Sequence, residues 1–386
     1  MAKLLWLNWS GGGNLPPSLG IARVLTERGH EVVFAGRPEM LGRVRDAGFR
    51  AIEIERSYAQ LDRYPQEPPA RMACYLTSPA VVDEVRGTIA DVRPDALLID
   101  AMFPAAFQAA ADFDLPSVAF FHHFLFRLRD EWKATGARLN AMREQAGFGS
   151  LPPLAQLWER CDRLIVTALA QLDTPADPSR TSVRHVGPVL EDERCAIPLT
   201  LPWDDGTVEP LALVSFSTAP EQRSLEKLQR TLDALAPLPM RVVATTGGVI
   251  DPDELSIPRN AIVVPYAQHD PILRRASVLI THGGHGTLMR SLKHGVPAIV
   301  MPGMAHDQAP NGRMIEALGA GIALPADADP GAIRFAAETI VATRSYAQSA
   351  RHLSRDLADA DGASGAATEI ESLRSLHIGG FHDQRT

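Results

Sequence analysis

Short apolar runs alternate along the chain with longer segments in which apolar residues recur every three or four positions. Runs such as 96–99 and 117–121 are apolar almost throughout, which is typical of strands buried on both faces of a parallel sheet. The longer segments place their apolar residues on one helical face. In the first half we predict strands at 4–8, 31–35, 49–54, 96–99, 117–121, 163–167 and 183–185, and helices at 18–28, 38–47, 80–92 and 105–113.

The same alternation starts again after residue 210. We predict strands at 211–215, 241–245, 261–264, 278–281, 298–301 and 321–324, and helices at 224–236, 270–276, 286–293, 309–318 and 330–342. Between the halves, residues 187–210 hold prolines and clustered acidic residues that interrupt regular structure.

The pattern therefore predicts an α/β protein with two doubly wound, Rossmann-like parallel-sheet domains that face each other across a central cleft. We assign residues 1–190 to the N-terminal domain, 191–210 to an interdomain linker and 211–386 to the C-terminal domain. The last helix can pack back on the N-terminal domain.

The composition limits the kind of protein. The chain has 386 residues, 45% hydrophobic and 22% charged, as in ordinary globular proteins. There are 38 Lys and Arg against 46 Asp and Glu, so the net charge is 38 − 46 = −8, which argues against binding to nucleic acid. The three cysteines, Cys74, Cys161 and Cys195, are too scattered for a disulfide framework or a metal site. The first residues form a strand rather than a signal peptide, and no apolar run is long enough to span a membrane, so we expect a cytoplasmic protein.

Residues 278–324 carry the most informative chemistry. The predicted strand ending at Thr281 is followed by His-Gly-Gly-His-Gly-Thr at 282–287 and then by a helix. Glycines at such a turn let a ligand approach the backbone, and the first N–H groups of a helix attract phosphate. Asp307 and Gln308 follow the next strand, on the same edge of the sheet, where they can bind the vicinal hydroxyls of a sugar.

These residues closely resemble the donor-binding signature of the family 1 glycosyltransferases of GT-B fold, particularly the bacterial enzymes that decorate natural products. The family's pattern is HGGxGT, then GVP, then P with DQ a few residues later. It is matched at 282–287, at 295–297, and at Pro302 with Asp307 and Gln308.

The resemblance extends over nearly the whole chain. Residues 264–268 are similar to the family's base-stacking segment, and residues 214–218 to its phosphate-contacting turn. Residues 186–188 resemble its interdomain hinge, and residues 13–32 its first βαβ unit.

The resemblance implies a role for each matching residue. Tyr266 would stack on uracil or thymine, and Gln268 would lie near the base and ribose. The diphosphate would be held by Ser217, Thr218, His282, Gly284, Gly286 and Thr287, and the sugar hydroxyls by Asp307 and Gln308. The implied reaction is inverting transfer from a UDP-linked or TDP-linked sugar to a small-molecule acceptor. It needs no metal ion, and no cofactor besides the nucleoside diphosphate sugar as co-substrate. A homodimer stays open.

The sequence departs from the family at the catalytic base. The family places a catalytic His, oriented by an Asp, after the first strand; Asn14 stands there instead, and an amide cannot act as a general base. The family's Asp is matched by Asp100. Three explanations stay open: Asp100 is itself the base, His122 or His123 is the base, or a phenolic, enolic or carbon acceptor needs little activation. We favour Asp100, and Asn14 then either caps the next helix or binds the acceptor.

A second departure is Arg290, where many relatives carry a Glu that binds the ribose hydroxyls. Arginine favours phosphate or a salt bridge on the helix face instead. The N-terminal domain is also rich in aromatic rings that suit an aromatic acceptor, although core packing is their more common role. These rings are Trp9, Phe103, Phe107, Phe121, Phe124 and Phe126.

Three other functions compete with a transferase. The loss of the base at Asn14 suits a catalytically weak auxiliary subunit that activates a partner glycosyltransferase. A sugar-nucleotide epimerase or hydrolase on the same fold also stays open. A nicotinamide-dependent enzyme is disfavoured, because the third glycine of a GxGxxG loop starting at residue 11 would fall on Pro16.

Overall fold

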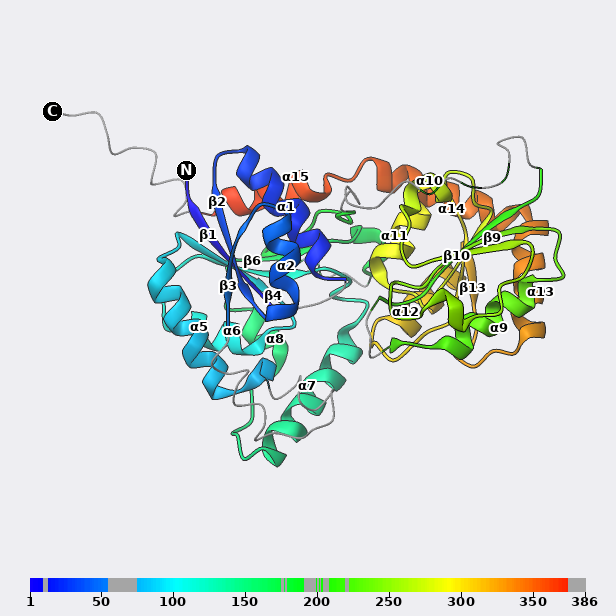
Figure 1. Cartoon of the computed structure of the whole chain (residues 1–386). Coiled ribbons are helices and arrows are strands. Elements are labelled where there is room, and N and C mark those ends of the chain that lie inside the picture. The colour runs from blue at the N-terminus through cyan, green and yellow to red at the C-terminus, as the bar shows by residue number, and fades with distance from the viewer. Residues whose placement is uncertain are drawn as a thin grey trace. The chain divides into compact units, whose positions relative to one another are not determined.

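The computed structural model describes residues 1–9, 13–54, 75–174, 177, 179–190, 199, 201, 203, 208–218 and 222–373. Two compact units make up the chain: Met1–Glu191 with Asp361–Thr386, and Asp192–Ala360. Each unit is built on one β-sheet with helices on both faces (Figure 1). The expected α/β class with two doubly wound sheets is confirmed.

The first unit holds a seven-stranded sheet in the order β3-β2-β1-β4-β5-β6-β7, in which all neighbours are parallel. Its strands are β1 (Lys3–Asn8), β2 (Glu31–Gly36), β3 (Arg50–Glu53), β4 (Ala96–Asp100), β5 (Ser117–Phe121), β6 (Arg163–Val166) and β7 (Val183–His185). Its helices are α1 (Leu15–Glu27), α2 (Pro38–Asp46), α5 (Pro79–Val92), α6 (Pro104–Ala110), α7 (Arg129–Gln145), α8 (Leu154–Trp158) and α15 (Gly362–Glu371). The strand order reverses between β1 and β4, which is where sheets of this kind form ligand sites.

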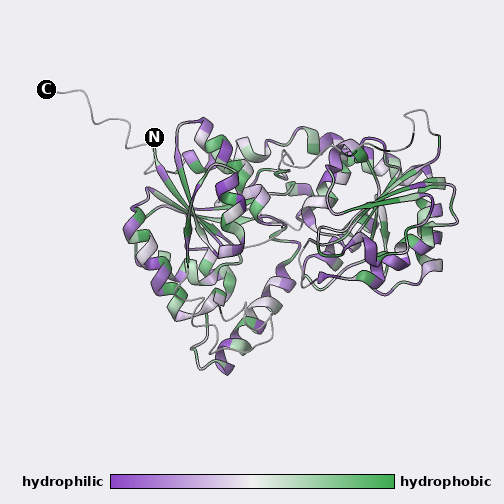
Figure 2. Ribbon diagram, in the orientation of Figure 1, coloured by the Kyte–Doolittle hydropathy of each residue, from purple (hydrophilic) through white to green (hydrophobic). Residues whose placement is uncertain are grey.

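Alternate residues of the strands point to opposite faces of this sheet. Leu4 and Trp6 pack with α1, α2 and α15, while Leu5 and Leu7 are equally buried on the other face, where α5 and α6 lie (Figure 1). The strands accordingly form a continuous apolar layer within the unit (Figure 2). Burial on both faces explains why the strands are apolar throughout rather than alternating.

The second unit holds a six-stranded parallel sheet in the order β10-β9-β8-β11-β12-β13. Its strands are β8 (Leu211–Ser215), β9 (Arg241–Thr245), β10 (Ala261–Val264), β11 (Val278–Thr281), β12 (Ala298–Val300) and β13 (Gly321–Ala323). Its helices are α9 (Leu225–Leu235), α10 (His269–Leu273), α11 (His285–Lys293), α12 (Gln308–Ala317), α13 (Pro330–Ala342) and α14 (Arg344–Ala358). Helices α9 and α13 cover one face of the sheet, and α11 and α12 cover the other.

The last helix, α15, lies in the first unit. Arg28 at the end of α1 donates to Glu371 at 2.7 Å and to Thr368 at 3.0 Å. The last helix therefore belongs with the N-terminal domain, as the sequence analysis allowed, and the second unit ends at Ala360 rather than at residue 386. Most residues of the expected linker, including all its clustered acidic residues, lie outside the described residues, as do Cys74 and Cys195.

Most predicted elements are confirmed, and several strands have the predicted bounds, among them β5, β8, β9, β10 and β11. Helix α1 begins at Leu15, before its predicted start, because Pro16 and Pro17 occupy the first turn, where a missing N–H group costs little. Helices α7, α8, α14 and α15 were not predicted. Helix α7, for example, buries only a narrow stripe that includes Thr135 and Arg143, which is a weak apolar signal.

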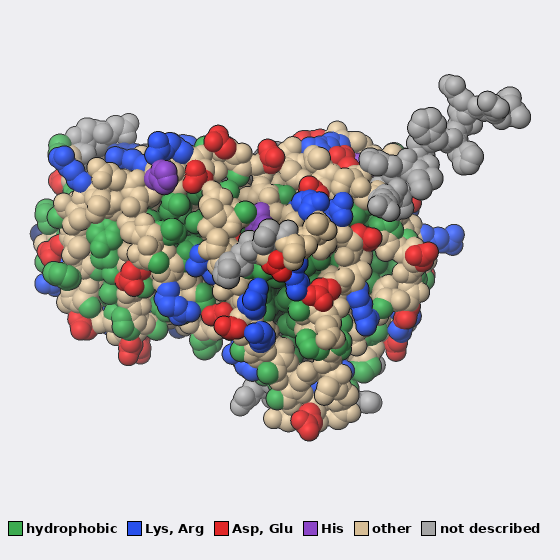
Figure 3. All heavy atoms as spheres, turned by 180° about the vertical axis from the view of Figure 1, so that it is seen from behind, with side chains coloured by type: hydrophobic (Ala, Val, Ile, Leu, Met, Phe, Trp, Pro, Cys, Tyr) green, Lys and Arg blue, Asp and Glu red, His purple; other side chains and the backbone are tan. Residues whose placement is uncertain are grey.

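Charged side chains of both signs are interspersed on the face shown in Figure 3. Among the described residues, no helix is both long enough and apolar enough to cross a membrane.

Candidate functional site

The predicted donor residues gather at one edge of the sheet of the second unit. The last residues of its six strands lie level, because they pair in one row across the sheet: Val264, Thr245, Ser215, Thr281, Val300 and Ala323. Since all these strands are parallel, the segments that follow them leave the sheet on the same side. Those segments carry Ser217 and Thr218 after β8, Tyr266 and Gln268 after β10, residues 282–287 after β11, and Asp307 and Gln308 after β12.

The segment after β9, which the sequence analysis missed, packs against two of these groups. Gly247 and Gly248 have φ angles of +65° and +72°, a region that favours glycine. A Cβ on Gly247 would lie 2.9 Å from Cα of Thr218, and one on Gly248 would lie 2.8 Å from Cζ of Tyr266. Tyr266 is 65% exposed, so its ring is accessible to a base. The buried hydroxyl of Thr246 has no hydrogen-bond partner among the described residues.

The turn after β11 needs glycine for its backbone path. Gly283 has a φ of +89°, and a Cβ there would lie 2.7 Å from Cγ1 of Val300. Nδ2 of Asn311 on α12 donates to the carbonyl oxygen of Gly283 at 2.8 Å and fixes the turn. Helix α11 follows, with Gly284 in the cap position, so no side chain occupies its first N–H groups. Such uncapped N–H groups at the positive end of a helix suit a phosphate.

His282 stands beside this helix start. A Cβ on Gly284 would lie 2.7 Å from Nε2 of His282, so the imidazole ring covers the glycine. Burial, and to a smaller extent the positive charge of Lys227, lower the pKa of His282 to about 4, although a hydrogen bond with the Ser215 backbone acts in the opposite direction. Without a ligand, His282 is therefore neutral at pH 7 and offers a hydrogen bond rather than a full charge.

Gln308 is buried and bound within the protein. Its Oε1 accepts from the Gly303 backbone N–H at 2.6 Å, and its Nε2 donates to Oε1 of Gln222 at 2.8 Å. Gln308 thus fixes the segment after β12. A direct hydrogen bond from Gln308 to a sugar would require one of these two hydrogen bonds to break. Asp307 is also largely buried and lies 3.4 Å from Nδ2 of Asn311, measured to its Oδ2.

Arg290 forms a salt bridge on the helix face, one of the two roles expected for it. Its Nη1 donates to Oδ2 of Asp270 at 2.8 Å, and Nε2 of His294 lies 2.9 Å from Oδ1 of Asp270. Burial raises the pKa of Asp270, but the Arg290 charge and the hydrogen bonds from His294 and Arg290 outweigh it and hold this pKa below its usual value. The contacts of Arg290 and His294 with Asp270 connect α11 to α10.

In the first unit, Asn14 and Asp100 meet at the carboxyl edge of the sheet. Nδ2 of Asn14 donates to Oδ2 of Asp100 at 3.0 Å and to Oδ1 of Asn8 at 2.6 Å. Asn8 and Asp100 are the last residues of β1 and β4, and each follows a residue of the pair Leu7 and Ile99. The Asn14 side chain makes no capping bond to α1, so the capping role considered for it is not observed. Asn8 was missed by the sequence analysis, although its place at the end of a predicted strand was a usable signal.

Asp100 is fully buried, and both of its oxygens are engaged. Oδ1 accepts from the Met102 backbone N–H at 2.8 Å, and Oδ2 faces Asn14 and, at 3.6 Å, Nδ1 of His122. The His122 side chain is 13% exposed, and its buried Nδ1 makes no hydrogen bond among the described residues. His123 is buried, with its ring centroid 5.0 Å from that of Trp132. This geometry favours His122 over Asp100 as the group that can reach an acceptor.

The aromatic rings of the N-terminal domain belong mainly to the core. Five of the six rings considered above are buried: Phe103, Phe107, Phe121, Phe124 and Phe126. Phe121, for example, packs edge-on against Trp132 and Trp158. The expectation of core packing is confirmed for these five.

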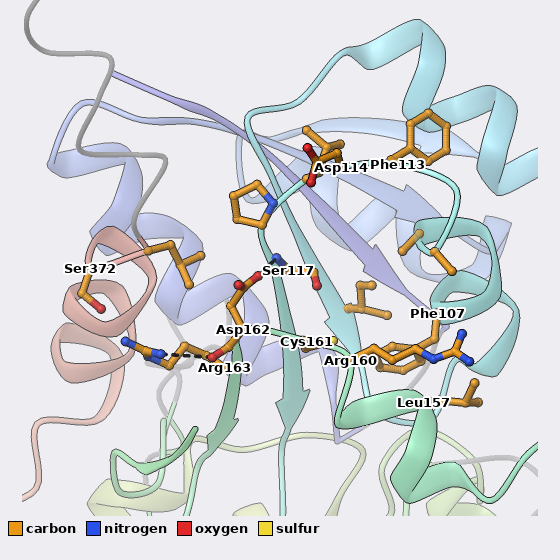
Figure 4. A pocket seen from close by; sticks show the side chains of 16 residues that line it. Phe107, Phe113, Asp114, Ser117, Leu157, Arg160, Cys161, Asp162, Arg163 and Ser372 are labelled. Atoms are coloured by element: carbon orange, nitrogen blue, oxygen red, sulfur yellow. Dashed lines mark hydrogen bonds between the residues drawn. The ribbon is translucent and has the colours of Figure 1, made fainter. Parts of the chain in front are cut away.

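A cavity of about 890 Å³ lies at the opposite edge of the first sheet (Figure 4). Its walls include Ser117 and Arg163, the first residues of β5 and β6, whereas Asp100 and His122 lie at or beyond the ends of their strands. Arg163 donates to the Asp162 backbone carbonyl at 3.0 Å in this wall. Burial raises the pKa of the Cys161 thiol, which also lines the cavity, to about 12. The cavity is therefore separate from the Asn14–Asp100–His122 group.

No group of three or more His, Cys, Asp or Glu side chains in the described parts of the chain is arranged to hold a metal ion.

Comparisons with known sequences give one family match and several relatives. Residues 229–373 match a domain described as the C-terminal domain of erythromycin biosynthesis protein CIII-like proteins. The chain is 24% identical to the NDP-glycosyltransferase YjiC of Bacillus subtilis (strain 168), over 95% of this chain and 96% of the relative. It is also 24% identical to the demethyllactenocin mycarosyltransferase of Streptomyces fradiae, over 82% of this chain and 74% of the relative.

Solved structures share the fold. CalG4, the calicheamicin glycosyltransferase, is similar with a TM-score of 0.77 and 24% identity over 99% of both chains. The glycosyltransferase VinC, solved in complex with DTDP, has a TM-score of 0.73 and 17% identity over 98% of this chain and 100% of that one. The architecture of two parallel sheets is thus the one found in these proteins.

Proposed function

We propose that this chain, which belongs to the family 1 glycosyltransferases of GT-B fold, transfers a sugar from a TDP-linked or UDP-linked donor to a small natural-product acceptor. The proposed route is inverting and uses no metal ion. One observation carries the proposal: the level strand ends of the second unit bring Tyr266, residues 282–287 and Asp307 to one edge of one sheet.

The exposed ring of Tyr266 is the proposed platform for the base. An aromatic face supplies stacking energy to any nucleobase, typically about 1–3 kcal/mol. Gly248 keeps a side chain away from the space beside this ring, and Gln268 would contact the base or the ribose. Because Arg290 is committed to Asp270, ribose recognition does not fall to it. A relative of the same fold was solved with DTDP, which supports including thymidine alongside uridine nucleotides.

The diphosphate would lie on the start of α11. The backbone N–H groups of Gly286 and Thr287 lie in the first turn of α11, at the positive end of the helix dipole. Ser217 and Thr218 would add hydroxyl donors. His282 would donate a hydrogen bond from its neutral ring. As negative charge develops on the departing diphosphate, the pKa of His282 rises, so that this residue can take up a proton where the charge appears.

The sugar would be held at the start of α12. The Asp307 carboxylate can accept hydrogen bonds from two vicinal hydroxyls. Gln308 would act chiefly by fixing the backbone of Gly303, as it already does in the structure.

We assign the acceptor base to His122, oriented by Asp100. The acceptor hydroxyl would give its proton to Nε2 of His122 while its oxygen attacks the anomeric carbon and the bond from that carbon to the diphosphate breaks. Nδ1 of the resulting imidazolium faces the Asp100 carboxylate, which stabilises the positive charge. Asn14 would fix Asp100 through its hydrogen bond and needs no proton-transfer role.

A transfer assay tests this function. The EDTA-treated full chain is incubated with TDP-glucose or UDP-glucose and a panel consisting of a phenol, an enol and a secondary alcohol. We expect acceptor-dependent release of TDP or UDP and, from an α-linked donor, a β-linked product by proton NMR coupling. Hydrolysis without transfer, an α-linked product or dependence on an added divalent metal would contradict the proposal.

The presence of Asn14 where the family has its catalytic His supports one further candidate, an auxiliary subunit that binds a donor but depends on a partner for turnover. The His122–Asp100 pair supports independent catalysis, because an imidazole lies 3.6 Å from the same carboxylate oxygen that Asn14 contacts. Donor binding without turnover on any acceptor, followed by turnover when a related transferase is added, would favour the auxiliary role.

A further inference from the structure

Lys227 places a buried ammonium group beneath the carboxyl edge of the second sheet. It lies on α9, on the helix face that also buries Thr231, and only 9% of the residue is exposed. Its Nζ donates to the carbonyl oxygens of Pro302 at 2.8 Å and Met301 at 3.4 Å. It also lies 5.8 Å from the ring centroid of Phe216.

These contacts locate the ammonium behind the phosphate turn. Phe216 follows β8, and Met301 and Pro302 follow β12, while β11 lies between those two strands in the sheet. The turn that begins with His282 therefore leaves the sheet between the segments that Lys227 touches. The charge of Lys227 acts on His282 strongly enough to lower its pKa, which agrees with this position.

Among the described residues, the ammonium has no carboxylate partner of the kind that buried cations usually have. No carboxylate of the described residues forms an ion pair with Lys227, and its hydrogen bonds go to backbone carbonyls. Burial accordingly lowers the pKa of Lys227, and the nearby charge of Arg230 acts in the same direction. An unpaired buried charge is costly, so a missing counter-ion points to an anionic ligand.

We propose that Lys227 is a positioning residue for the donor diphosphate: its fixed charge attracts the diphosphate from behind residues 282–287, and its hydrogen bonds hold the segment that leads to Asp307. This inference rests on the proposed function. It gives the leaving group a positively charged neighbour in a poorly solvated place, where charge acts more strongly than in water. It also leaves His282 neutral until a diphosphate arrives.

The test compares nucleotides with nucleosides in charge-removing variants of the full chain. Lys227→Met keeps most of the apolar stem, and Lys227→Gln keeps a hydrogen-bond donor. Lys293→Met is the matched control, because Lys293 is an exposed lysine on α11 of the same unit. Calorimetry measures the Kd of TDP, UDP, thymidine and uridine. Loss of a unit charge near the diphosphate should raise the Kd of TDP and UDP by about 10- to 100-fold in both Lys227 variants. The Kd of the nucleosides in these variants, and every Kd in the Lys293→Met control, should stay within about twofold of the native value.

A purely structural role would give different results. Equal weakening of nucleoside and diphosphate binding, or no change in either, would overturn the inference, and so would failure of both variants to fold. As a second readout, the variants should raise the pKa of His282 above about 4 in a proton NMR titration. If the native chain binds neither TDP nor UDP, the proposed function itself fails. Native binding with unchanged variants would refute only the role of Lys227.

Discussion

Replacing His122 by Ala tests which group accepts the acceptor proton. The side chain is 13% exposed, and its recorded contacts are with Oδ2 of Asp100 at 3.6 Å and with the ring of His123, 4.4 Å between centroids. Its removal should therefore lower the free energy of unfolding by only about 1–2 kcal/mol. A general base typically contributes about 10²–10⁴-fold to the rate, which is a loss of about 3–5 kcal/mol in barrier lowering.

The assay measures kcat with a saturating donor and a proven alcohol acceptor, together with the Kd of TDP and UDP. We expect kcat to fall by about 10²–10⁴-fold while donor affinity stays within about twofold, because the predicted donor residues belong to the other unit. If His122→Ala keeps kcat within about tenfold, a change of only ~1.4 kcal/mol, His122 is not the base, and Asp100 again becomes the leading choice.

A second Asp–His pair at the same sheet edge provides the control. Nε2 of His185, the last residue of β7, lies 2.9 Å from Oδ2 of the buried Asp173. Asp173 also accepts from the backbone N–H groups of Leu125 and Arg127, so this pair braces a loop. His185→Ala should lower stability but leave kcat within about tenfold. Loss of turnover in this variant, with His122→Ala active, would move the base to His185.

Three further predictions follow from single contacts. Arg290→Met leaves the half-buried Asp270 without its guanidinium partner and should lower the free energy of unfolding in urea by about 1–3 kcal/mol. The affinity for TDP and UDP should stay within about threefold of the native value, and tenfold weaker nucleotide binding would instead indicate a phosphate contact. Gly248→Ala forces a side chain into a φ of +72° and against the Tyr266 ring, and should weaken thymidine and uridine binding about tenfold by calorimetry; unchanged affinity would show that the base does not stack there. Because burial and the charge of a neighbouring lysine lower the pKa of His282 to about 4, the unfolded chain binds a proton there below about pH 6.5 that the folded chain does not. Native stability is thus lost as pH falls from about 6.5 to about 4. His282→Gln should lose less stability over this pH range when unfolding in urea is measured. An identical pH dependence in the native chain and the variant would contradict the assignment.

The sequence was most informative about strands and about which residues share an edge. Fully buried parallel strands have an apolar run with polar residues after it, so β8, β10 and β11 could be bounded well, and the residues that follow them could be placed together. Helices α7 and α14 bury narrow stripes and leave most of their surface polar, which makes them hard to distinguish from loops.

Side-chain partners could not be predicted in the same way. Asn14 and Asp100 are 86 residues apart in the sequence, and their hydrogen bond depends on β1 and β4 becoming neighbours. The contacts that occupy both ends of the Gln308 amide depend likewise on tertiary packing. Lys227 was not singled out from the sequence, because only the structure shows that the face of α9 that it shares with Thr231 is buried.

The central claim is a metal-independent donor site in the second unit, and titration calorimetry of the full chain with TDP and UDP tests it most directly. Titrations are run with and without EDTA, on the native protein, on His282→Ala and on His352→Ala, a control that removes an exposed histidine from α14 of the same unit. The account predicts binding of at least one nucleotide that survives EDTA, persists in His352→Ala and weakens at least about tenfold in His282→Ala. Absence of binding to both nucleotides, or binding that EDTA abolishes, would contradict it.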